Sequence, residues 1–290
     1  MKKGSLLIIL CIILLLGFSP SRNFFQRQEH GAQPIEIAEV LKICAVYCDK
    51  LENASLNFVC LEEITEKVNL SRDVRLNYHY SSGWTRSLMS IQTKIKNTYV
   101  YDLQFVRKNS QIKEVRILLE ENGKKKNEKD ASLKTISFLF KNVLFGPVGI
   151  LSQKWQPYFE YKLVGEDKVN DEPAVILDVI PKARFKRDFL FGKVWLNKND
   201  FSILKIEWNP QGMRNYVIFE SLGLKYKSEP QITLISEFNI KKNNIRFPSK
   251  LFIEEAYVDK AGKKFVRSET NVIYKDYKFF TVTVEVEVKQ

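Results

Sequence analysis

Apolar and polar side chains alternate residue by residue along several segments, and this alternation constrains the fold more than any other feature. The alternation is sharpest between 281 and 289, where polar or charged residues separate Val282, Val284, Val286 and Val288. A period of two predicts β-strands with one buried and one wet face, which is typical of antiparallel sheets. The sequence therefore predicts that a large antiparallel sheet dominates the fold.

Further strands are predicted wherever short apolar or alternating runs lie between turn residues. The predicted strands are 58–61, 99–106, 112–121, 158–164, 174–180, 189–196, 201–208, 232–240 and the last strand, with a hairpin turn at 109–110. The charged run at 123–130 (GKKKNEKD) is predicted to be an exposed loop. The apolar segment 133–144 is predicted to be a short helix that stops at Gly146-Pro147.

An amphipathic helix is predicted over 34–51. Its apolar residues recur at helical spacing, and they are Ile37, Val40, Leu41, Cys44, Tyr47, Cys48 and Leu51. The opposite face carries both acids and lysines, whereas a helix that lies on a membrane surface favours a basic polar face. We therefore expect this helix to pack on the sheet.

The predicted sheet must bury its apolar face, and two helices cannot cover a flat sheet of about ten strands. We therefore expect a mainly β (α+β) fold with a large, strongly curved antiparallel sheet, or half-open β-barrel. The N-terminal amphipathic helix and the short internal helix would form its lid. The apolar inner face can hold an acyl chain, and the candidate lipid-binding residues are Ile37, Val40, Leu41, Tyr47, Leu204, Ile206, Trp208 and Phe238.

The N-terminus resembles a secretory signal peptide. Two lysines precede an apolar run from 6 to 18, and Ser19-Pro20-Ser21 supplies the small residues that a cleavage site needs. We place the cut after Ser21, which gives a signal peptide (1–21), a flexible segment (22–34) and a single curved-sheet domain (35–290). The run is shorter than the roughly 20 residues of a membrane span. An uncleaved anchor is the alternative, and in either case we expect the mature chain in the periplasm.

Export would place the cysteines in an oxidising compartment. We expect a disulfide between Cys48 and Cys60, although Cys44 lies on the same helix face as Cys48 and could replace it. One thiol would remain free. A metal site is not expected, because the cysteine spacings match no zinc pattern and no histidine lies nearby.

Catalytic motifs are absent from the sequence. It contains no nucleophile elbow, phosphate-binding loop, dinucleotide-binding glycine pattern or zinc-protease motif. Its two histidines, His30 and His79, lie in a predicted tail and at a predicted strand end. We therefore expect a protein that is not an enzyme and needs no cofactor.

Several segments resemble the lipoprotein-carrier superfamily of the bacterial envelope. The resemblance rests on YKLVGEDKVNDEPAVILDVIP (161–181), FGKVWLNKNDFSILKIEW (191–208), IRFPS (245–249), YKDY (274–277) and FF (279–280). The superfamily includes the periplasmic carrier of outer-membrane lipoproteins, its outer-membrane receptor and an anti-sigma-factor-binding sensor. The resemblance implies a half-open antiparallel sheet whose concave side is plugged by helices and accepts acyl chains.

Two functions follow as hypotheses. The first is an envelope protein that binds lipid or acyl chains and carries lipids or lipoproteins towards the outer membrane. The second is a protein-binding or sensor module whose barrel is filled by its own side chains. The chain has 46 Lys and Arg against 34 Asp and Glu, a net charge of +12. Basic runs at 124–126 and 182–187 are therefore candidates for contact with an anionic membrane surface or an envelope protein. Export excludes nucleic acid as a usual partner.

Overall fold

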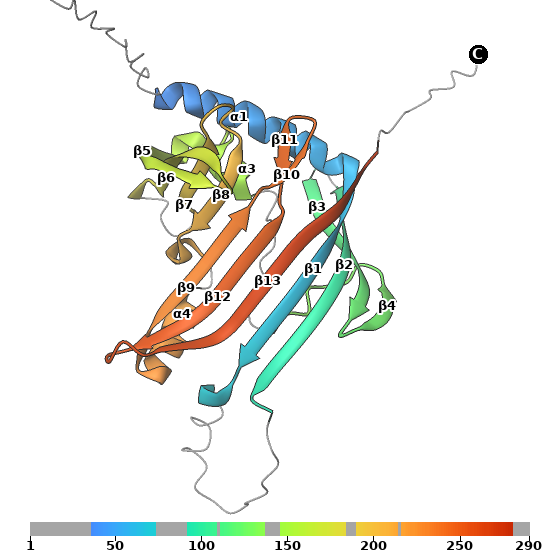
Figure 1. Cartoon of the computed structure of the whole chain (residues 1–290), viewed down its shortest axis with the longest axis vertical. Helices are drawn as coiled ribbons and strands as arrows, with labels where there is room; N and C mark the ends of the chain where they lie inside the picture. The colour runs from blue at the N-terminus through green and yellow to red at the C-terminus, as the bar shows by residue number, and fades with distance from the viewer. Residues whose placement is uncertain are drawn as a thin grey trace, which may run out of the picture. The chain divides into compact units, whose positions relative to one another are not determined.

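One antiparallel sheet dominates the fold (Figure 1). The computed structural model describes residues 36–73, 92–108, 111–136, 146–183, 190–213 and 216–280. Over these residues, eleven strands form the main sheet: β1 (Phe58–Asn69), β2 (Lys94–Lys108), β3 (Gln111–Glu121), β4 (Lys124–Glu128), β5 (Phe159–Val169), β6 (Glu172–Pro181), β7 (Gly192–Asn197), β8 (Ile203–Trp208), β9 (Ser228–Glu237), β12 (Lys250–Asp259) and β13 (Lys264–Phe279). Two short strands, β10 (Ile240–Lys242) and β11 (Ile245–Phe247), pair as a separate hairpin.

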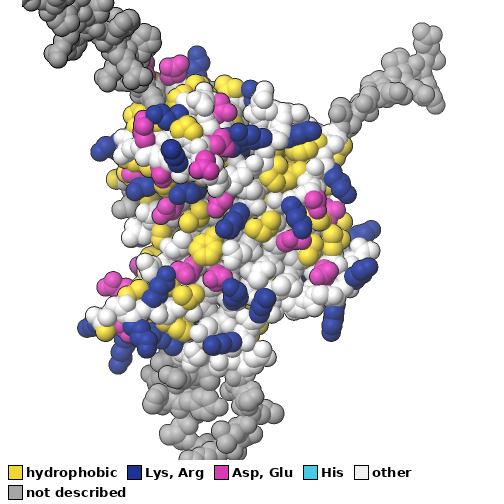
Figure 2. Space-filling view, in the orientation of Figure 1, with side chains coloured by type: hydrophobic (Ala, Val, Ile, Leu, Met, Phe, Trp, Pro, Cys, Tyr) yellow, Lys and Arg dark blue, Asp and Glu magenta, His cyan; other side chains and the backbone are white. Residues whose placement is uncertain are grey.

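The strand order is β4-β3-β2-β1-β13-β12-β9-β8-β7-β6-β5. The end strands β4 and β5 do not pair with each other in the described part of the chain, so the sheet stays open. Charged side chains of both signs cover the face seen in Figure 1 (Figure 2). The predicted fold class is confirmed: the protein is mainly β, with one large open antiparallel sheet and few helices.

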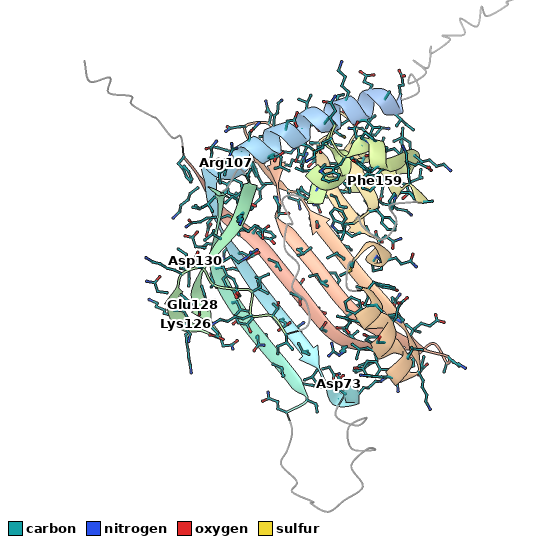
Figure 3. All side chains as sticks on the ribbon, turned by 180° about the vertical axis from the view of Figure 1, so that it is seen from behind. Asp73, Arg107, Lys126, Glu128, Asp130 and Phe159 are labelled. Atoms are coloured by element: carbon teal, nitrogen blue, oxygen red, sulfur yellow. The ribbon has the colours of Figure 1, made fainter. Side chains whose placement is uncertain are left out.

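Helices pack against the sheet face that carries the core. The helices of the described segments are α1 (Ile37–Ala54), α3 (Gly146–Leu151) and α4 (Tyr216–Tyr226), with single 3-10 turns η1 (Ser55–Asn57), η2 (Gln156–Tyr158) and η4 (Pro210–Gly212). Seen from behind, α1 crosses one end of the sheet and α4 lies at the opposite end (Figure 3). The predicted N-terminal helix is thus present, and it begins and ends three residues later than expected.

The core explains why α1 forms where it does. Its buried residues Val40, Cys44, Cys48 and Leu51 recur every three or four positions and belong to one cluster with side chains from both halves of the sheet. Helical spacing places these side chains on one stripe, and burying that stripe stabilises a helix more than its intrinsic propensity does. α1 is therefore held by tertiary packing.

The predicted helix at 133–144 is wrong over its described part. Residues 133–136 have no helical hydrogen bonds, and the backbone N–H of Ile136 instead donates to the Glu66 carboxylate at 2.8 Å. Residues 137–145 lie outside the described residues. The short internal helix is α3, which begins at Gly146, because Pro147 suits a first helical turn, where its missing N–H costs nothing.

The predicted loop at 123–130 is also wrong, because it contains the edge strand β4. All five residues of β4 are exposed, and Lys124 and Lys125 lie opposite Glu121 and Glu120 of β3. Charged side chains, lysine above all, are common on edge strands because they discourage pairing with other chains. The lysine run therefore has a structural role at the sheet edge.

Several sequence predictions fall outside the described residues. They are the signal peptide (1–21), the flexible segment (22–34), both histidines, the turn at 109–110, most of the basic run 182–187 and the final strand at 281–289. Ile35–Gln290 is one compact unit, and the unit before it, Met1–Pro34, is not described, so the division after Ser21 stays a prediction. Among the helices that the structure describes, none has both the length and the apolar character of a membrane span.

Candidate functional site

Strands β8 and β9 separate soon after they pair, and this opens the sheet. Their register consists of Lys205↔Glu237, Ile206↔Ser236 and Glu207↔Ile235. In contrast, β9 stays paired with β12 along its whole length, from Glu237 to Ser228. The first part of β9 therefore has no strand on its β8 side, and a gap forms there between the two strands.

The residues after β8 interrupt its pairing. Pro210 has no backbone N–H to donate to a neighbouring strand, so the hydrogen-bond ladder ends before it. The Asn209 side chain then accepts a hydrogen bond from the Gln211 backbone N–H at 3.0 Å and begins η4. The chain passes through η4 and α4 before it returns as β9.

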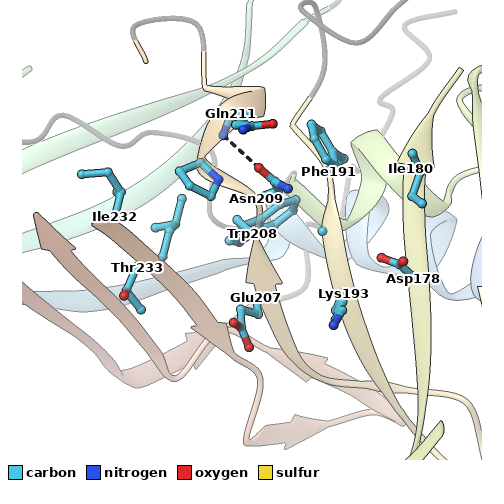
Figure 4. A pocket seen from close by; sticks show the side chains of 13 residues that line it. Asp178, Ile180, Phe191, Lys193, Glu207, Trp208, Asn209, Gln211, Ile232 and Thr233 are labelled. Carbon is cyan, nitrogen blue, oxygen red and sulfur yellow. Dashed lines mark hydrogen bonds between the residues drawn. The ribbon is translucent and has the colours of Figure 1, made fainter. Parts of the chain in front are cut away.

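A cleft of about 440 Å³ lies between β8 and β9 where they separate (Figure 4). Its volume lies within the ~300–1,000 Å³ range of small-molecule sites. About half of its lining is apolar, with Phe191 just before β7, Trp208 of β8, and aliphatic residues from β6 and β9. The lining residues of this β8–β9 cleft are Asp178, Ile180, Phe191, Gly192, Lys193, Glu207, Trp208, Asn209, Pro210, Gln211, Ile232, Thr233 and Leu234.

The cleft reaches the core because its lining comes from both faces of the sheet. Phe191, Trp208 and Leu234 belong to the main core cluster. Lys193 and Glu207 alternate with core residues along their strands and therefore point to the other face. An apolar ligand in this gap would contact the core without displacing α1.

Trp208 is held in place by three neighbours. Its indole N–H donates to the Ser236 hydroxyl on β9 at 3.0 Å. A Cβ at Gly146 would lie 2.8 Å from the Trp208 ring, so only glycine lets α3 approach the indole so closely. On β7, a Cβ at Gly192 would lie 2.1 Å from the Glu207 carbonyl oxygen, so this strand pair also requires glycine. The apolar floor of the cleft is thus preorganised.

Charged side chains form the polar side of the cleft. Lys193 of β7 lies in register between Asp178 of β6 and Glu207 of β8. Figure 4 shows these three side chains on one side of the cleft, away from the η4 turn. The arrangement suits an amphiphile, because an apolar chain can contact Trp208 while a polar group stays near Lys193.

The rest of the inner face divides into two chemically different halves. On β6 the inward residues Val175, Leu177 and Val179 are aliphatic and buried. On β1 and β3, by contrast, Glu62 and Arg116 form a buried ion pair. A buried charge is costly unless it is paired, so this half is suited to its own network rather than to an acyl chain. The apolar half is the one that borders the β8–β9 cleft.

A second opening lies between α1 and the β10–β11 hairpin. It measures about 660 Å³, and its lining residues are Ile43, Val46, Tyr47, Lys50, Asp200, Ser202, Lys241, Lys242, Asn243, Asn244, Ile245 and Arg246. We call it the hairpin groove. Most of its lining residues are polar or charged, although its lining surface is about as apolar as that of the β8–β9 cleft.

Arg246 ties the hairpin groove together. Its side chain is 2% exposed, and its guanidinium donates to the Glu172 carboxylate and to the Ser202 hydroxyl. These hydrogen bonds hold the pKa of Glu172 below its usual range. The Arg246 carbonyl accepts a hydrogen bond from the Tyr47 hydroxyl of α1 at 2.6 Å. The arginine thus connects α1, the hairpin and β6.

The predicted lipid-binding residues do not gather around one opening. Trp208 lines the β8–β9 cleft, and Tyr47 lines the hairpin groove. Val40, Ile206 and Phe238 are each 0% exposed within the main core. The remaining helix residues, Ile37 and Leu41, are half-buried. A role in lipid binding stays a prediction for all of them.

Leu204 requires a correction, because it does not share a face with Ile206 and Trp208. It packs with Ala174 and Trp195 in a separate cluster, whereas Ile206 and Trp208 lie in the main core. The cause is a β-bulge. Lys205 pairs with Trp195 and Ile203 with Leu196, so Leu204 is the extra residue and turns to the other face.

The expected disulfide requires a correction as well. Cys48 and Cys60 carry free, buried thiols, and so does Cys44. The two predicted partners face different parts of the core. The Cys48 thiol donates to the carbonyl oxygen of Pro147 in α3 at 3.7 Å, while Cys60 lies beside Tyr277 of β13. Among the described residues, no group of three or more metal-ligating side chains lies together.

Most of the cleft could not be predicted from the sequence. Phe191, Ile232 and Leu234 lie in predicted strands, but nothing local indicated that β8 and β9 separate. Two local sequence features did point to this region. Asn209-Pro210 indicates the end of β8, and apolar residues at helical spacing indicate α4. Tyr216, Phe219, Gly223 and Tyr226 recur every three or four positions, and the last three are buried.

Together, these features define an open-sheet protein with a lid helix and a surface cleft that reaches an apolar core. No family model matches the chain, and no curated protein matches it. Solved structures do resemble it. One is a domain from Vibrio parahaemolyticus described as a putative outer membrane lipoprotein-sorting protein domain. It is 12% identical, with a TM-score of 0.43, over 86% of this chain and 96% of that one.

Two further structures are similar. A DUF1329 family protein from Desulfovibrio piger is 11% identical, with a TM-score of 0.41, over 84% of this chain and 92% of that one. A LolA superfamily protein from Nitrosomonas europaea is 11% identical, with a TM-score of 0.34, over 86% and 96%. The similar structures thus include the superfamily that the sequence resembles. At such TM-scores they assign no function, so the site itself must support one.

Proposed function

We propose that the chain binds the acyl part of a lipid or of an acylated protein in the β8–β9 cleft. The observation that carries this proposal is the open volume of the cleft, which the exposed Ile180 lines together with Trp208 and Leu234 of the buried core. Burial of acyl groups at about 0.8 kcal/mol per CH₂ supplies affinity without specific polar contacts. A catalytic constellation is not needed for this role.

The proposal also includes the compartment in which the chain acts. The basic start, apolar run and small residues of 1–21 are typical of a secretory signal, so the chain would work in the periplasm, where acyl chains need a carrier. A cut after Ser21 would leave Arg22 as the first residue. Transport of lipids or lipoproteins towards the outer membrane is one use of such binding.

The core beneath α1 supports the second hypothesis for that end of the molecule. Val40, Cys44 and Cys48 of α1 are each 0% exposed, and the enclosed space beside Cys60 and Tyr277 measures only about 10 Å³. Side chains therefore fill the region under the lid, as a protein-binding module would require. The two hypotheses differ in whether the β8–β9 cleft takes up an acyl chain.

A filled cleft tests the proposal. Thr233→Trp places a large side chain in the open volume, and Ile180→Gln makes the 43% exposed rim residue polar. Titration with a fluorescent fatty acid should show affinity falling at least about tenfold for Thr233→Trp. The fall should be about fivefold for Ile180→Gln, because part of an aliphatic contact is lost.

Val164→Gln is the matched control, since Val164 is also 43% exposed and lies on β5, outside the cleft. Its affinity should stay within about twofold of the unmodified chain, where surface substitutions usually fall. Equal affinity in all four proteins, each with an unchanged unfolding midpoint, would place the acyl site elsewhere and overturn the proposal.

A further inference from the structure

Helix α4 is apolar on two opposite sides. Phe219, Gly223 and Tyr226 are buried against the start of β9, the end of β12 and the start of β13. The packing is close, because a Cβ at Gly223 would lie 2.7 Å from the Ser228 carbonyl oxygen. This side alone accounts for the position of α4 on the sheet.

The opposite side of α4 faces solvent with large apolar side chains. Val217 is 62% exposed, Ile218 is 53% exposed and Leu224 is 82% exposed. Ser221 lies between them on the same helical face, and its hydroxyl donates to the Val217 carbonyl at 2.9 Å, so its polar group is already bonded. Contiguous exposed apolar residues on a helix mark an interaction surface rather than random exposure.

Lysines border this apolar face, and so does the exposed Glu220. Lys225 lies in the last turn of the helix, and Lys227 follows the helix with a positive φ of 52°. Neither forms an ion pair with a residue that the structure describes. The turn between β12 and β13 adds Lys260 and Lys263, and Figure 2 shows Lys and Arg side chains at that end of the molecule, together with Asp and Glu. Tyr226 packs on Tyr257 and Phe265, which brings the turn close to α4.

We propose that the exposed face of α4, formed by Val217, Ile218, Ser221, Leu224 and Lys225, docks on the surface of an anionic lipid bilayer. Apolar side chains would enter the headgroup boundary while the lysines attract anionic lipids. The alternative occupant, a second copy of this chain, fits less well. An 11-residue helix is about 16 Å long, and one such face is small against the ~1,200–2,000 Å² of a stable protein interface.

The docking face differs from the lysine run at 124–126 in its exposed aliphatic side chains. Between 120 and 134 the chain has five lysines and four acids. Lys126 pairs with Glu121, and Lys134 pairs with Glu121 and Glu128, so the local charge is nearly balanced. No comparable set of exposed aliphatic side chains accompanies that run among the described residues.

The position of α4 links docking to the proposed function, although docking does not require an occupied cleft. The helix lies in the connection between β8 and β9, and both Gln211 before it and Ile232 after it line the cleft. Docking through α4 would therefore hold the rim of the β8–β9 cleft close to a source of acyl chains.

Co-sedimentation with vesicles tests the docking. The probes are phosphatidylcholine vesicles with and without phosphatidylglycerol, and the protein is purified from the envelope of a bacterial host with its N-terminus defined by mass. Ile218→Glu/Leu224→Glu should lower binding to the anionic vesicles at least about tenfold. Lys225→Gln/Lys227→Asn should lower binding about tenfold or more on vesicles that contain phosphatidylglycerol, and should leave binding to pure phosphatidylcholine vesicles unchanged. Asparagine is chosen at position 227 because it tolerates a positive φ.

Val46→Glu is the matched control, because Val46 is 50% exposed on a different helix, α1. It should bind vesicles within about twofold of the unmodified chain. Equal vesicle binding by the chain and by Ile218→Glu/Leu224→Glu would overturn the proposal. The proposal would also be overturned if the unmodified protein self-associates while Ile218→Glu/Leu224→Glu is monomeric. That result would assign the exposed face of α4 to a dimer interface. Ile180→Gln should retain vesicle binding, which separates failure of docking from failure of acyl binding.

Discussion

The three cysteines of the described core show how burial decides the chemistry of a residue. Cys44, Cys48 and Cys60 are at most 2% exposed. Burial raises the pKa of the Cys44 thiol to about 12, and burial together with the nearby Glu62 raises the pKa of the Cys60 thiol to about 12. Because the thiolate is the reactive form, these side chains act as small apolar core residues.

Thiol labelling checks this at the residue scale. We expect Cys44, Cys48 and Cys60 to react with an alkylating reagent at least about a hundredfold faster in denaturant than in the folded protein, because the raised pKa and the burial both suppress attack. Mass spectrometry of the labelled, unreduced protein counts the alkyl groups. A denatured protein in which Cys48 and Cys60 stay unlabelled until reduction would show that the two residues form a disulfide.

At the scale of elements, alternation identified most of the sheet, because each strand buries one face and exposes the other. The strands around 99–121 and 174–208 required no more than this pattern and their turn residues. The alternation predicted the wrong face of the sheet for Leu204, because a bulge turns a side chain to the other face without changing the local sequence pattern. Strand β4 was not predicted at all, because an edge strand whose residues are all exposed has no alternation of apolar and polar residues.

The close approach of β7 and β8 gives a prediction for these elements. Gly192→Ala should destabilise the fold by about 1–3 kcal/mol, because its Cβ would lie 2.1 Å from backbone that cannot move freely. Gly165→Ala on β5 is the control: no atom lies within 4 Å of its Cβ, so we expect a neutral or slightly stabilising effect. Urea unfolding of both variants measures the difference. Similar midpoints would show that the strands separate easily and that the cleft floor is not rigid.

For the whole molecule, the sequence predicted an open, curved antiparallel sheet with two helices as its lid, since two helices cannot cover a flat sheet of about ten strands. It could not predict the β8–β9 cleft. Whether two strands stay paired depends on partners distant in the chain, here β12, which holds β9 along its full length while β8 ends at Trp208. Local pattern predicts elements, whereas the gap between elements arises from their assembly.

The same assembly connects the two proposals. The connection from β8 to β9 carries the η4 rim of the cleft and the exposed face of α4, so one insertion in the sheet provides both the opening and a surface for docking. A carrier needs both features, because its ligand leaves a bilayer before it enters an apolar site. Each can nonetheless fail alone, since they use different side chains.

Native mass spectrometry of the protein purified without detergent from a bacterial envelope tests the central claim most directly. We expect the unmodified protein to carry an added mass that organic solvent releases as phospholipid or acylated peptide. The fraction of protein with this added mass should be much smaller for Thr233→Trp. Mass spectra of the unmodified chain that show no bound lipid, before and after incubation with phospholipid vesicles, would contradict acyl binding in the β8–β9 cleft.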